Sequence, residues 1–277
     1  MSIESCGTEN MNVLILGANG MMGSMLNYFG NKYTNFKIIS LGRDKFNAFN
    51  SIEELDKYIN KNTVIINSIG AIPQKKYNDN EYIYLNTTFP LKLAEYSLAK
   101  NIPLIHLSTN CVFSGKLPNL TEDDMCDADD TYGISKANGE PQTAVVLRCS
   151  IIGFEKNTSS GLLEWFLKSN NDICGYSDSF WNGLTTLELS KAIYNIIAQK
   201  LFTPRIEHHY SQNTLSKYEM LNEFLKYTDK QITISQKNNG IKYYTLSSKY
   251  DTNHSSLEDQ IKELFEIQND YRAYHSE

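Results

Sequence analysis

The sequence is poor in the features that mark membrane-spanning, secreted and metal-binding proteins. No apolar run approaches the ~18 residues that a transmembrane helix needs. The first ten residues are polar and have neither the basic start nor the apolar centre of a secretory signal. The 277 residues include only 5 cysteines, an odd number without a Cys-x-x-Cys spacing. These absences predict a reduced, cytoplasmic protein with no disulfide framework, no metal site and no membrane partner.

Positive charge is also scarce in this chain. Its 26 Lys and Arg residues are outnumbered by 32 Asp and Glu residues, so the formal net charge is −6 at pH 7. A chain of this charge has no general attraction to nucleic acid or to an anionic membrane. His208 and His209 lack further ligands nearby, so we expect them at the surface rather than in a metal site. These observations predict a small-molecule partner.

The most informative segment follows the apolar run 13–16. Gly17, Gly20 and Gly23 form a Gly-x-x-Gly-x-x-Gly pattern. In such a pattern the first glycine serves a tight turn, the second admits phosphates close to the backbone, and the third lets helix and strand pack closely. The start of the following helix offers free N–H groups to an anion. The pattern predicts a dinucleotide-binding turn with contacts from Gly17, Asn19, Gly20, Met21, Met22 and Gly23.

Short apolar runs rich in β-branched residues alternate with helical patterns up to about residue 150. The runs lack polar alternation, as expected for parallel strands that are buried on both faces. This order predicts an α/β fold, a Rossmann-type doubly wound parallel sheet with a smaller C-terminal substrate-binding lobe. The predicted strands are residues 12–16, 36–41, 63–68, 103–108 and 144–149.

The chain divides into three predicted parts. Residues 1–11 form a flexible leader, residues 12–150 an NAD(P)-binding domain, and residues 151–277 mainly a substrate-binding lobe with some segments returning to the sheet.

Ser51 and Glu54 form a capping-box pattern, which predicts an α-helix to about residue 60. Further helices are predicted over residues 90–100, 162–168, 187–200, 218–227 and 257–266.

Tyr132 and Lys136 stand four residues apart and therefore share one face of a helix. A nearby ammonium favours the phenolate, so such a tyrosine can exchange a proton near neutral pH. Upstream, Ser108 and Thr109 end an apolar strand at the carboxyl edge of the sheet, where open α/β folds bind ligands. Thr109 can donate a hydrogen bond to a carbonyl oxygen that Tyr132 protonates. Together these residues predict carbonyl reduction; the alternative is a solvated helical pair.

These segments resemble the extended short-chain dehydrogenase/reductase family, and within it the dTDP-4-dehydrorhamnose reductase-like branch. The resemblance covers roughly residues 12–153 and is loose beyond them. The segments that carry it are the three glycines, Asn67-Ser68-Ile69-Gly70, Asn86, residues 107–113 and residues 132–136.

The resemblance implies that Tyr132 is the proton donor, that Lys136 lowers its pKa and binds the nicotinamide ribose, and that Thr109 orients the carbonyl. It also implies cofactor contacts from Asn67, Ser68, Ile69, Gly70 and Asn86, and substrate contacts from Ser108 and Asn110. Trp181 can stack on a nucleotide base or line the sugar pocket. Core packing is the alternative for Trp181. The implied reaction reduces the C4 carbonyl of a nucleotide-diphosphate 4-keto-6-deoxysugar in surface-polysaccharide or nucleotide-sugar biosynthesis. A homodimer is left open.

The end of the second predicted strand bears on the choice of cofactor. An acidic residue there binds the ribose of NAD, whereas a basic residue accepts the 2′-phosphate of NADP. Gly42 stands at the acidic position and Arg43 follows it, which favours NADP. Asp44 keeps NAD open, and an ion pair with Asp44 is the alternative for Arg43.

The sequence departs from the branch directly after Thr109, where Asn110 and Cys111 replace the usual Asp-Tyr pair. Cys111 stands at a position similar to that of the cysteine base in GDP-fucose synthase-like enzymes. A bifunctional epimerase/reductase with Cys111 as base is therefore an alternative, and a small apolar role for Cys111 is another. A third alternative is a regulatory subunit that binds NADP without turnover, although Tyr132 and Lys136 argue against it.

Overall fold

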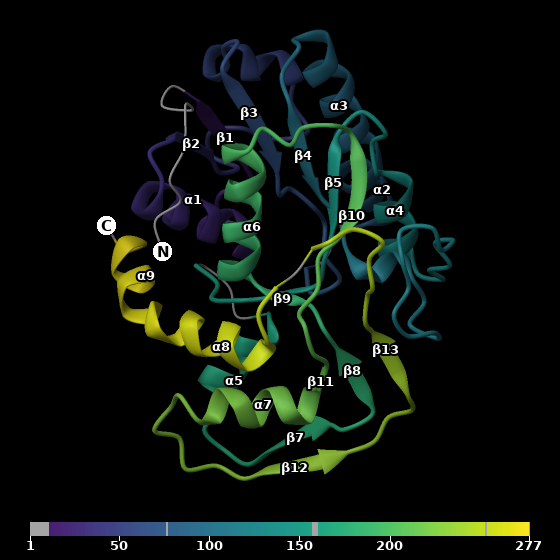
Figure 1. The fold of residues 1–277 in the computed structure, drawn as a ribbon, viewed down its shortest axis with the longest axis vertical. Coiled ribbons are helices and arrows are strands. Elements are labelled where there is room, and N and C mark those ends of the chain that lie inside the picture. Colours follow the sequence, from purple (N-terminus) through teal and green to yellow (C-terminus); the bar gives the residue numbers. More distant parts are fainter. Residues whose placement is uncertain (1–10, 76, 157–159, 253, 277) are drawn as a thin grey trace.

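A computed structural model describes residues 11–75, 77–156, 160–252 and 254–276. Its centre is a six-stranded sheet in the order β10-β5-β4-β3-β1-β2, in which all neighbours are parallel (Figure 1). The strands are β1 (Asn12–Leu16), β2 (Lys37–Leu41), β3 (Thr63–Asn67), β4 (Leu104–Leu107), β5 (Val145–Arg148) and β10 (Arg205–His208).

Five of these strands lie within one residue of their predicted ends, and the predicted fold class is confirmed. The sixth strand, β10, was not predicted; it comes from the second half of the chain and pairs with β5. Residues 1–10 of the predicted leader lie outside the described residues, and Met11 packs partly buried against the core.

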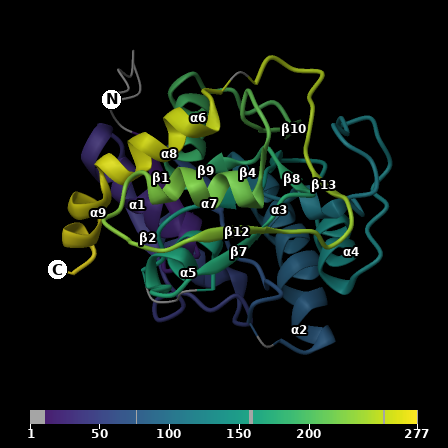
Figure 2. The same ribbon diagram turned by 90° about the horizontal axis from the view of Figure 1, so that it is seen from below.

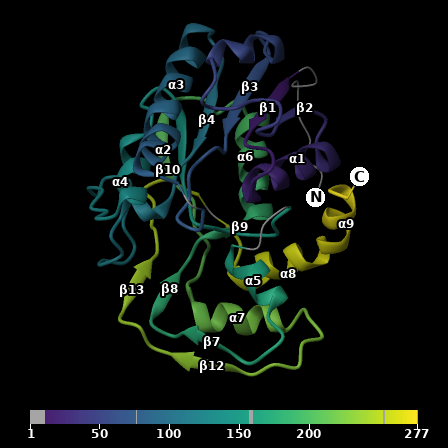
Figure 3. The ribbon, with the colours of Figure 1, turned by 180° about the vertical axis from the view of Figure 1, so that it is seen from behind.

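Helices cover both faces of the sheet. They are α1 (Met21–Tyr33), α2 (Asp79–Ile83), α3 (Phe89–Ala99), α4 (Thr131–Asn138) and α6 (Thr186–Ala198). Val13 and Ile15 belong to the core on the α1 and α6 side, whereas Leu14 and Leu16 belong to the core on the α3 side. Successive side chains of a strand point to opposite faces, so a strand covered on both sides reads as a continuous apolar run. Figure 3 shows the α3 side, with α6 behind the sheet.

Three short helical segments depart from the α-helix. They are η1 (Ile52–Tyr58, 3-10), η2 (Tyr84–Thr88, π) and η3 (Asn110–Val112, 3-10). The prediction of an α-helix opened by a capping box at Ser51 was wrong, because η1 is a 3-10 helix and Ser51 caps no backbone group. Its hydroxyl instead donates to the Glu53 carboxylate, a local side-chain bond that competes with capping.

The rest of the second half forms small sheets and helices below the central sheet (Figures 1 and 2). The paired strands are β6 (Ile151–Ile152) with β9 (Leu184–Thr185), β7 (Ile173–Tyr176) with β12 (Ile234–Lys237), and β8 (Ser179–Trp181) between β11 (Leu215–Ser216) and β13 (Lys242–Tyr244). The helices are α5 (Leu162–Lys168), α7 (Lys217–Leu225), α8 (Leu257–Glu266) and α9 (Gln268–Tyr274). None of the helices in the described ranges is both long and apolar enough to cross a membrane.

The C-terminal helix α9 packs beside α1, as Figures 1 and 3 show. Asp270 accepts a hydrogen bond from the Tyr28 hydroxyl at 2.5 Å and pairs with Lys32 at 2.7 Å. The hydroxyls of Tyr271 and Ser24 lie 2.8 Å apart in the buried part of this contact. The end of the chain thereby supports the helix that follows the glycine turn.

A buried ion pair links α4 to the ends of β4 and β5. The Arg148 guanidinium donates to both carboxylate oxygens of Glu140, at 2.9 and 2.7 Å, and both side chains are only 5% exposed. The Ser108 hydroxyl donates to the same carboxylate at 2.5 Å. Because Glu140 follows α4 directly, this network fixes the position of the helix that carries Tyr132 and Lys136.

Removing the negative charge of this pair will destabilise the fold. We expect Glu140→Gln to lower the free energy of unfolding by about 3–5 kcal/mol, since it leaves the Arg148 charge buried without its counter-ion. Denaturant unfolding measures this change. Lys116→Met is the control, because the Lys116–Asp129 pair spans 3.7 Å between exposed side chains. The control should cost under about 1 kcal/mol, and equal losses in both variants would contradict the assignment.

Candidate active site

The predicted site residues gather at the carboxyl edge of the central sheet. β1 has β2 on one side and β3 on the other, so the chain changes direction across the sheet at β1. Open α/β folds bind ligands outside the carboxyl ends of the strands at such a point. The glycine turn follows β1, and Thr109 follows β4 two strands away.

The backbone of the glycine turn requires glycine at two positions. Gly17 has φ +82°, and a Cβ on Gly23 would lie 2.2 Å from the Gly17 carbonyl oxygen. The predicted turn and close-packing roles are therefore confirmed. Gly20 differs, because its Cβ would meet only one atom, at 3.3 Å, and its φ is −80°. Packing within the chain does not demand glycine there, as expected if a ligand approaches this position.

The start of α1 is open to an anion. Gly20 is the N-cap, no side chain caps the helix, and its first turn contains no acidic residue. The Met22 side chain is 5% exposed and belongs to the core, so this residue offers only its backbone to a ligand. Free N–H groups and the helix dipole favour a phosphate at this position. The residues present thus fit a dinucleotide, and the contacts themselves remain a prediction.

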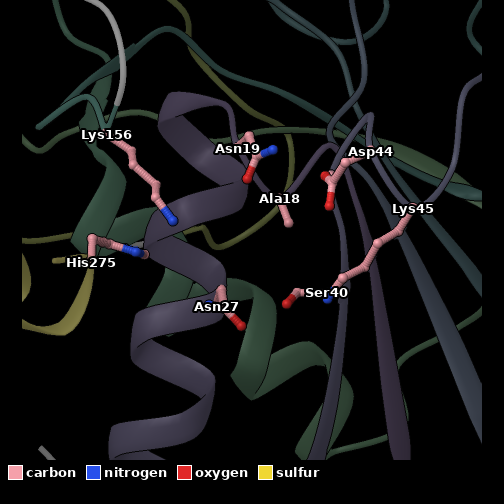
Figure 4. Close-up of a pocket in the computed structure, with 9 residues that line it drawn as sticks. Ala18, Asn19, Asn27, Ser40, Asp44, Lys45, Lys156 and His275 are labelled. Carbon is pink, nitrogen blue, oxygen red and sulfur yellow. The ribbon is translucent and has the colours of Figure 1, made fainter. Parts of the chain in front are cut away.

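A pocket of about 230 Å³ extends from the turn to the end of β2 (Figure 4). Lys45 lines this pocket, whereas Arg43 donates to the Tyr77 hydroxyl at 3.3 Å. Arg43 and Asp44 form no ion pair with each other, although both are described. Lys45 was not among the residues predicted from the sequence. Its basic charge shortly after β2 is the signal that could have identified it. The lining residues are Ala18, Asn19, Asn27, Ser40, Gly42, Asp44, Lys45, Lys156 and His275.

Two buried asparagines hold the segment that follows β3. Asn67 accepts a hydrogen bond from the Ile69 N–H at 3.1 Å and contacts Nδ1 of His106 at 3.1 Å. Asn86, in the π-helix η2, exchanges two hydrogen bonds with the backbone of Ala71, at 2.8 and 3.0 Å. Both asparagines are fully buried, so the structure gives them a positioning role. A π-helix at such a residue is a frequent feature of functional sites.

The residues between these anchors are the half-buried Ser68, Ile69 and Gly70. The Ser68 hydroxyl donates to the Leu16 carbonyl at 2.6 Å, which ties the segment to the end of β1. A Cβ on Gly70 would lie 4.0 Å from Nζ of Lys136. The segment therefore connects the glycine turn to the predicted catalytic lysine.

α4 carries Tyr132 and Lys136 on one face, as predicted. Asp130 caps the helix by accepting the Gly133 N–H at 2.6 Å. The Lys136 ammonium is buried and donates to the Leu107 carbonyl at 2.7 Å. Burial lowers the pKa of Lys136 to about 8, so its charge is held less firmly than that of an exposed lysine.

Thr109 stands at the N-cap of η3, where its Oγ1 accepts the Cys111 N–H at 3.1 Å. The Thr109 hydroxyl also interacts with Tyr132 and favours its phenolate. Burial outweighs this effect and raises the pKa of Tyr132 above its usual value. The net pKa of Tyr132 is thus raised, and Tyr132 keeps its proton at neutral pH. The Lys136 ammonium donates to the Leu107 carbonyl. That Lys136 lowers the pKa of Tyr132 stays a prediction.

Cys111 is half-buried beside Thr109, and its Sγ lies 3.6 Å from Oδ1 of Asn110. Burial raises the pKa of its thiol, which opposes the formation of a thiolate base. Asn110 is buried as well, with 4% of its surface exposed. These surroundings fit the small apolar role better than the role of a base.

Three further predictions need correction or restriction. The Ser108 hydroxyl donates to the Glu140 carboxylate, so its hydrogen is already engaged within the chain. Trp181 is 5% exposed in the core and donates to the Ser150 hydroxyl at 2.7 Å, which fits the packing alternative.

His208 and His209 are buried, so their expected surface position was wrong; His208 packs against Arg148. Among the described residues no cluster of three or more His, Cys, Asp or Glu side chains could hold a metal ion.

The family model described as RmlD substrate binding domain matches residues 11–267. No curated protein matches the sequence. Solved structures of similar fold include dTDP-4-dehydrorhamnose reductases from Clostridium acetobutylicum (18% identity, TM-score 0.78, 94% of this chain and 100% of that chain) and Bacillus anthracis in complex with NADP (18%, 0.80, 92% and 99%). A third, from Yersinia enterocolitica, has 17% identity, a TM-score of 0.76 and coverage of 92% and 99%.

The glycine turn yields a test that separates folding from binding. We expect Gly20→Ala to fold with nearly unchanged thermal stability, because its Cβ would meet only the Gly17 carbonyl oxygen, at 3.3 Å. It should lose at least about tenfold in affinity for the dinucleotide, because the Cβ would hinder the approach of a phosphate to the backbone. Gly23→Ala should lower the melting temperature strongly, since its Cβ would overlap the Gly17 carbonyl. Calorimetric melting and fluorescence titration measure the two effects. Tight dinucleotide binding by Gly20→Ala would refute this site.

Proposed function

The chain belongs to the RmlD substrate binding domain family, and we propose that it is an NADPH-dependent reductase of nucleotide-diphosphate 4-keto-6-deoxysugars. The observation that carries the proposal is the joint placement of Thr109, Tyr132 and Lys136 at the sheet edge that also bears the glycine turn. The dTDP-4-dehydrorhamnose reductases of similar fold support it, and one of them holds NADP.

The chemistry of this site follows from its protonation states. Bound NADPH supplies the hydride. Thr109 donates a hydrogen bond that orients the C4 carbonyl oxygen, and Tyr132 protonates this oxygen as charge develops on it. The Tyr132 phenol, whose pKa is raised by burial, carries its proton at neutral pH, as a proton donor must. The Lys136 ammonium would stabilise the tyrosinate that remains and would bind the nicotinamide ribose of the cofactor.

The pocket beside β2 supports NADPH as the preferred cofactor. Lys45 lines this pocket, and Arg43 stands between its lining residues Gly42 and Asp44. A 2′-phosphate adds the negative charge that these two cations would pair with. Asp44 is the one acidic residue of the pocket lining and keeps NAD open as the alternative.

Neither alternative function is favoured. The Cys111 thiol is protonated at neutral pH, which weakens the epimerase hypothesis. A regulatory subunit has no need of Thr109, Tyr132 and Lys136 in this arrangement. The nucleotide-sugar substrate, a role in surface-polysaccharide biosynthesis, a cytoplasmic location and a homodimer all belong to the proposal.

The main test is the loss of the proton donor. We expect wild-type protein to oxidise NADPH with at least one member of a panel of dTDP-, UDP-, GDP- and CDP-linked 4-ketosugars. Tyr132→Phe should lower kcat at least about 100-fold, because no acid replaces the phenol, and should leave NADPH affinity unchanged. Tyr250→Phe, at an exposed tyrosine, is the control. Full activity of Tyr132→Phe would refute the mechanism.

Cofactor choice gives a second test. Arg43→Met and Lys45→Met should each raise the KM for NADPH about tenfold or more and leave the KM for NADH nearly unchanged, because only NADPH carries the charge that these side chains bind. Steady-state kinetics with both cofactors measure the effect. Lys37→Met, at the exposed start of β2, is the matched control. Equal changes for NADPH and NADH would contradict a 2′-phosphate site.

A further inference from the structure

Lys217 is a cation without a carboxylate partner in a place that solvent reaches only partly. It is the first residue of α7 and is half-buried. No acidic side chain among the described residues lies within ion-pair distance of its Nζ. Burial lowers the pKa of Lys217, which reflects the cost of holding an ammonium away from water without a counter-ion.

The fold brings this lysine from the second half of the chain to the catalytic loop. The loop that follows Thr109 is hydrogen-bonded to β13 and the residues after it: the Tyr243 N–H donates to the Gly115 carbonyl at 3.0 Å, and the Ser247 N–H donates to the Leu120 carbonyl at 2.9 Å. β13 pairs with β8, β8 pairs with β11, and β11 leads directly into α7. In Figures 1 and 3, β13 lies below α4 on the same side of the molecule.

The surroundings of Lys217 place it at the reaction site. Its Nζ lies over the ring of Tyr244, 5.3 Å from the ring centre, which holds the ammonium through a cation–π contact. Its charge acts on the Cys111 thiol, and Cys111 in turn acts on Tyr132. Because Tyr244 follows Tyr243, which is hydrogen-bonded to Gly115, the cation lies beside the strand that is joined to the loop after Thr109.

We propose that Lys217 binds the diphosphate of the sugar-nucleotide substrate. This inference rests on the proposed function, because the phosphates are the charged groups that a nucleotide-diphosphate ketosugar brings to the cleft. They are attached to C1, across the ring from C4, so a sugar whose C4 faces Tyr132 directs them away from Tyr132, and Lys217 would be the cation that receives them. The substrate diphosphate serves as the counter-ion that Lys217 lacks among the described residues. Lys217 thereby sets the affinity for the nucleotide, and Tyr132 donates the proton.

Binding of nucleoside diphosphates tests this inference without turnover. dTDP, UDP, GDP and CDP, with the matching nucleosides, are titrated by calorimetry into the full-length protein saturated with NADP⁺. For the diphosphates that wild type binds, Lys217→Met should weaken affinity at least about tenfold, and Lys217→Arg should restore most of it. Affinity for the nucleosides and for NADP⁺ should stay unchanged. Lys242→Met, at an exposed lysine on β13, is the matched control.

Several outcomes would overturn the inference: wild type binds none of the four diphosphates, Lys217→Met binds them as tightly as wild type, or diphosphate and nucleoside affinity fall together. Thermal melting of each variant, with Lys217→Gln as a second substitution, identifies a folding defect. If wild type reduces no ketosugar but binds a diphosphate through Lys217, the proposed reduction fails and this inference stands. If reduction occurs and Lys217→Met leaves the KM for the ketosugar unchanged, the proposed reduction stands and the inference on Lys217 fails.

Discussion

The site depends on backbone carbonyls near the carboxyl ends of the strands. They accept hydrogen bonds from the glycine turn, from the loop after β3 and from α4. Leu41 accepts from Gly17 and Ala18 at 3.0 and 3.1 Å, and Leu16 accepts from the backbone and hydroxyl of Ser68. The Leu107 carbonyl accepts from Lys136 at 2.7 Å. Because parallel strands all end at the same edge, these bonds join segments that are distant in sequence into one surface. The turn, the loop after β3 and α4 are thereby positioned by the sheet itself.

Burial then sets the chemistry of that surface. It raises the pKa of Tyr132, lowers that of Lys136 to about 8, and keeps His106 neutral by lowering its pKa far below the usual value. Each shift favours the uncharged form, as desolvation requires. The site therefore holds a protonated phenol on the same helix as a buried lysine whose charged form is disfavoured by burial. Lys217 follows the same rule from the other lobe.

Local patterns predicted the first five strands well, because long apolar runs between glycine turns leave few alternatives. They missed β10, whose Arg205, Glu207 and His208 read as a polar loop; it becomes a strand only because β5 offers a free edge. The capping box at Ser51 failed because its hydroxyl binds Glu53. Asn67 and Asn86 were identified by resemblance. Their anchoring role depends on hydrogen bonds with the backbone of Ile69, 2 residues away, and of Ala71, 15 residues away.

The sequence alone predicted the glycine turn, the parallel sheet, and Thr109, Tyr132 and Lys136 as site residues. The glycine pattern and the Tyr132–Lys136 spacing each lie within a short segment, and apolar runs mark the strands. Only the tertiary structure decided which charges meet at the site. It placed Lys45 rather than Arg43 in the pocket by β2, turned Ser108 toward Glu140, and brought Lys217 over the ring of Tyr244. Such meetings depend on which strands pair and how deeply side chains are buried, and neither is written in local sequence.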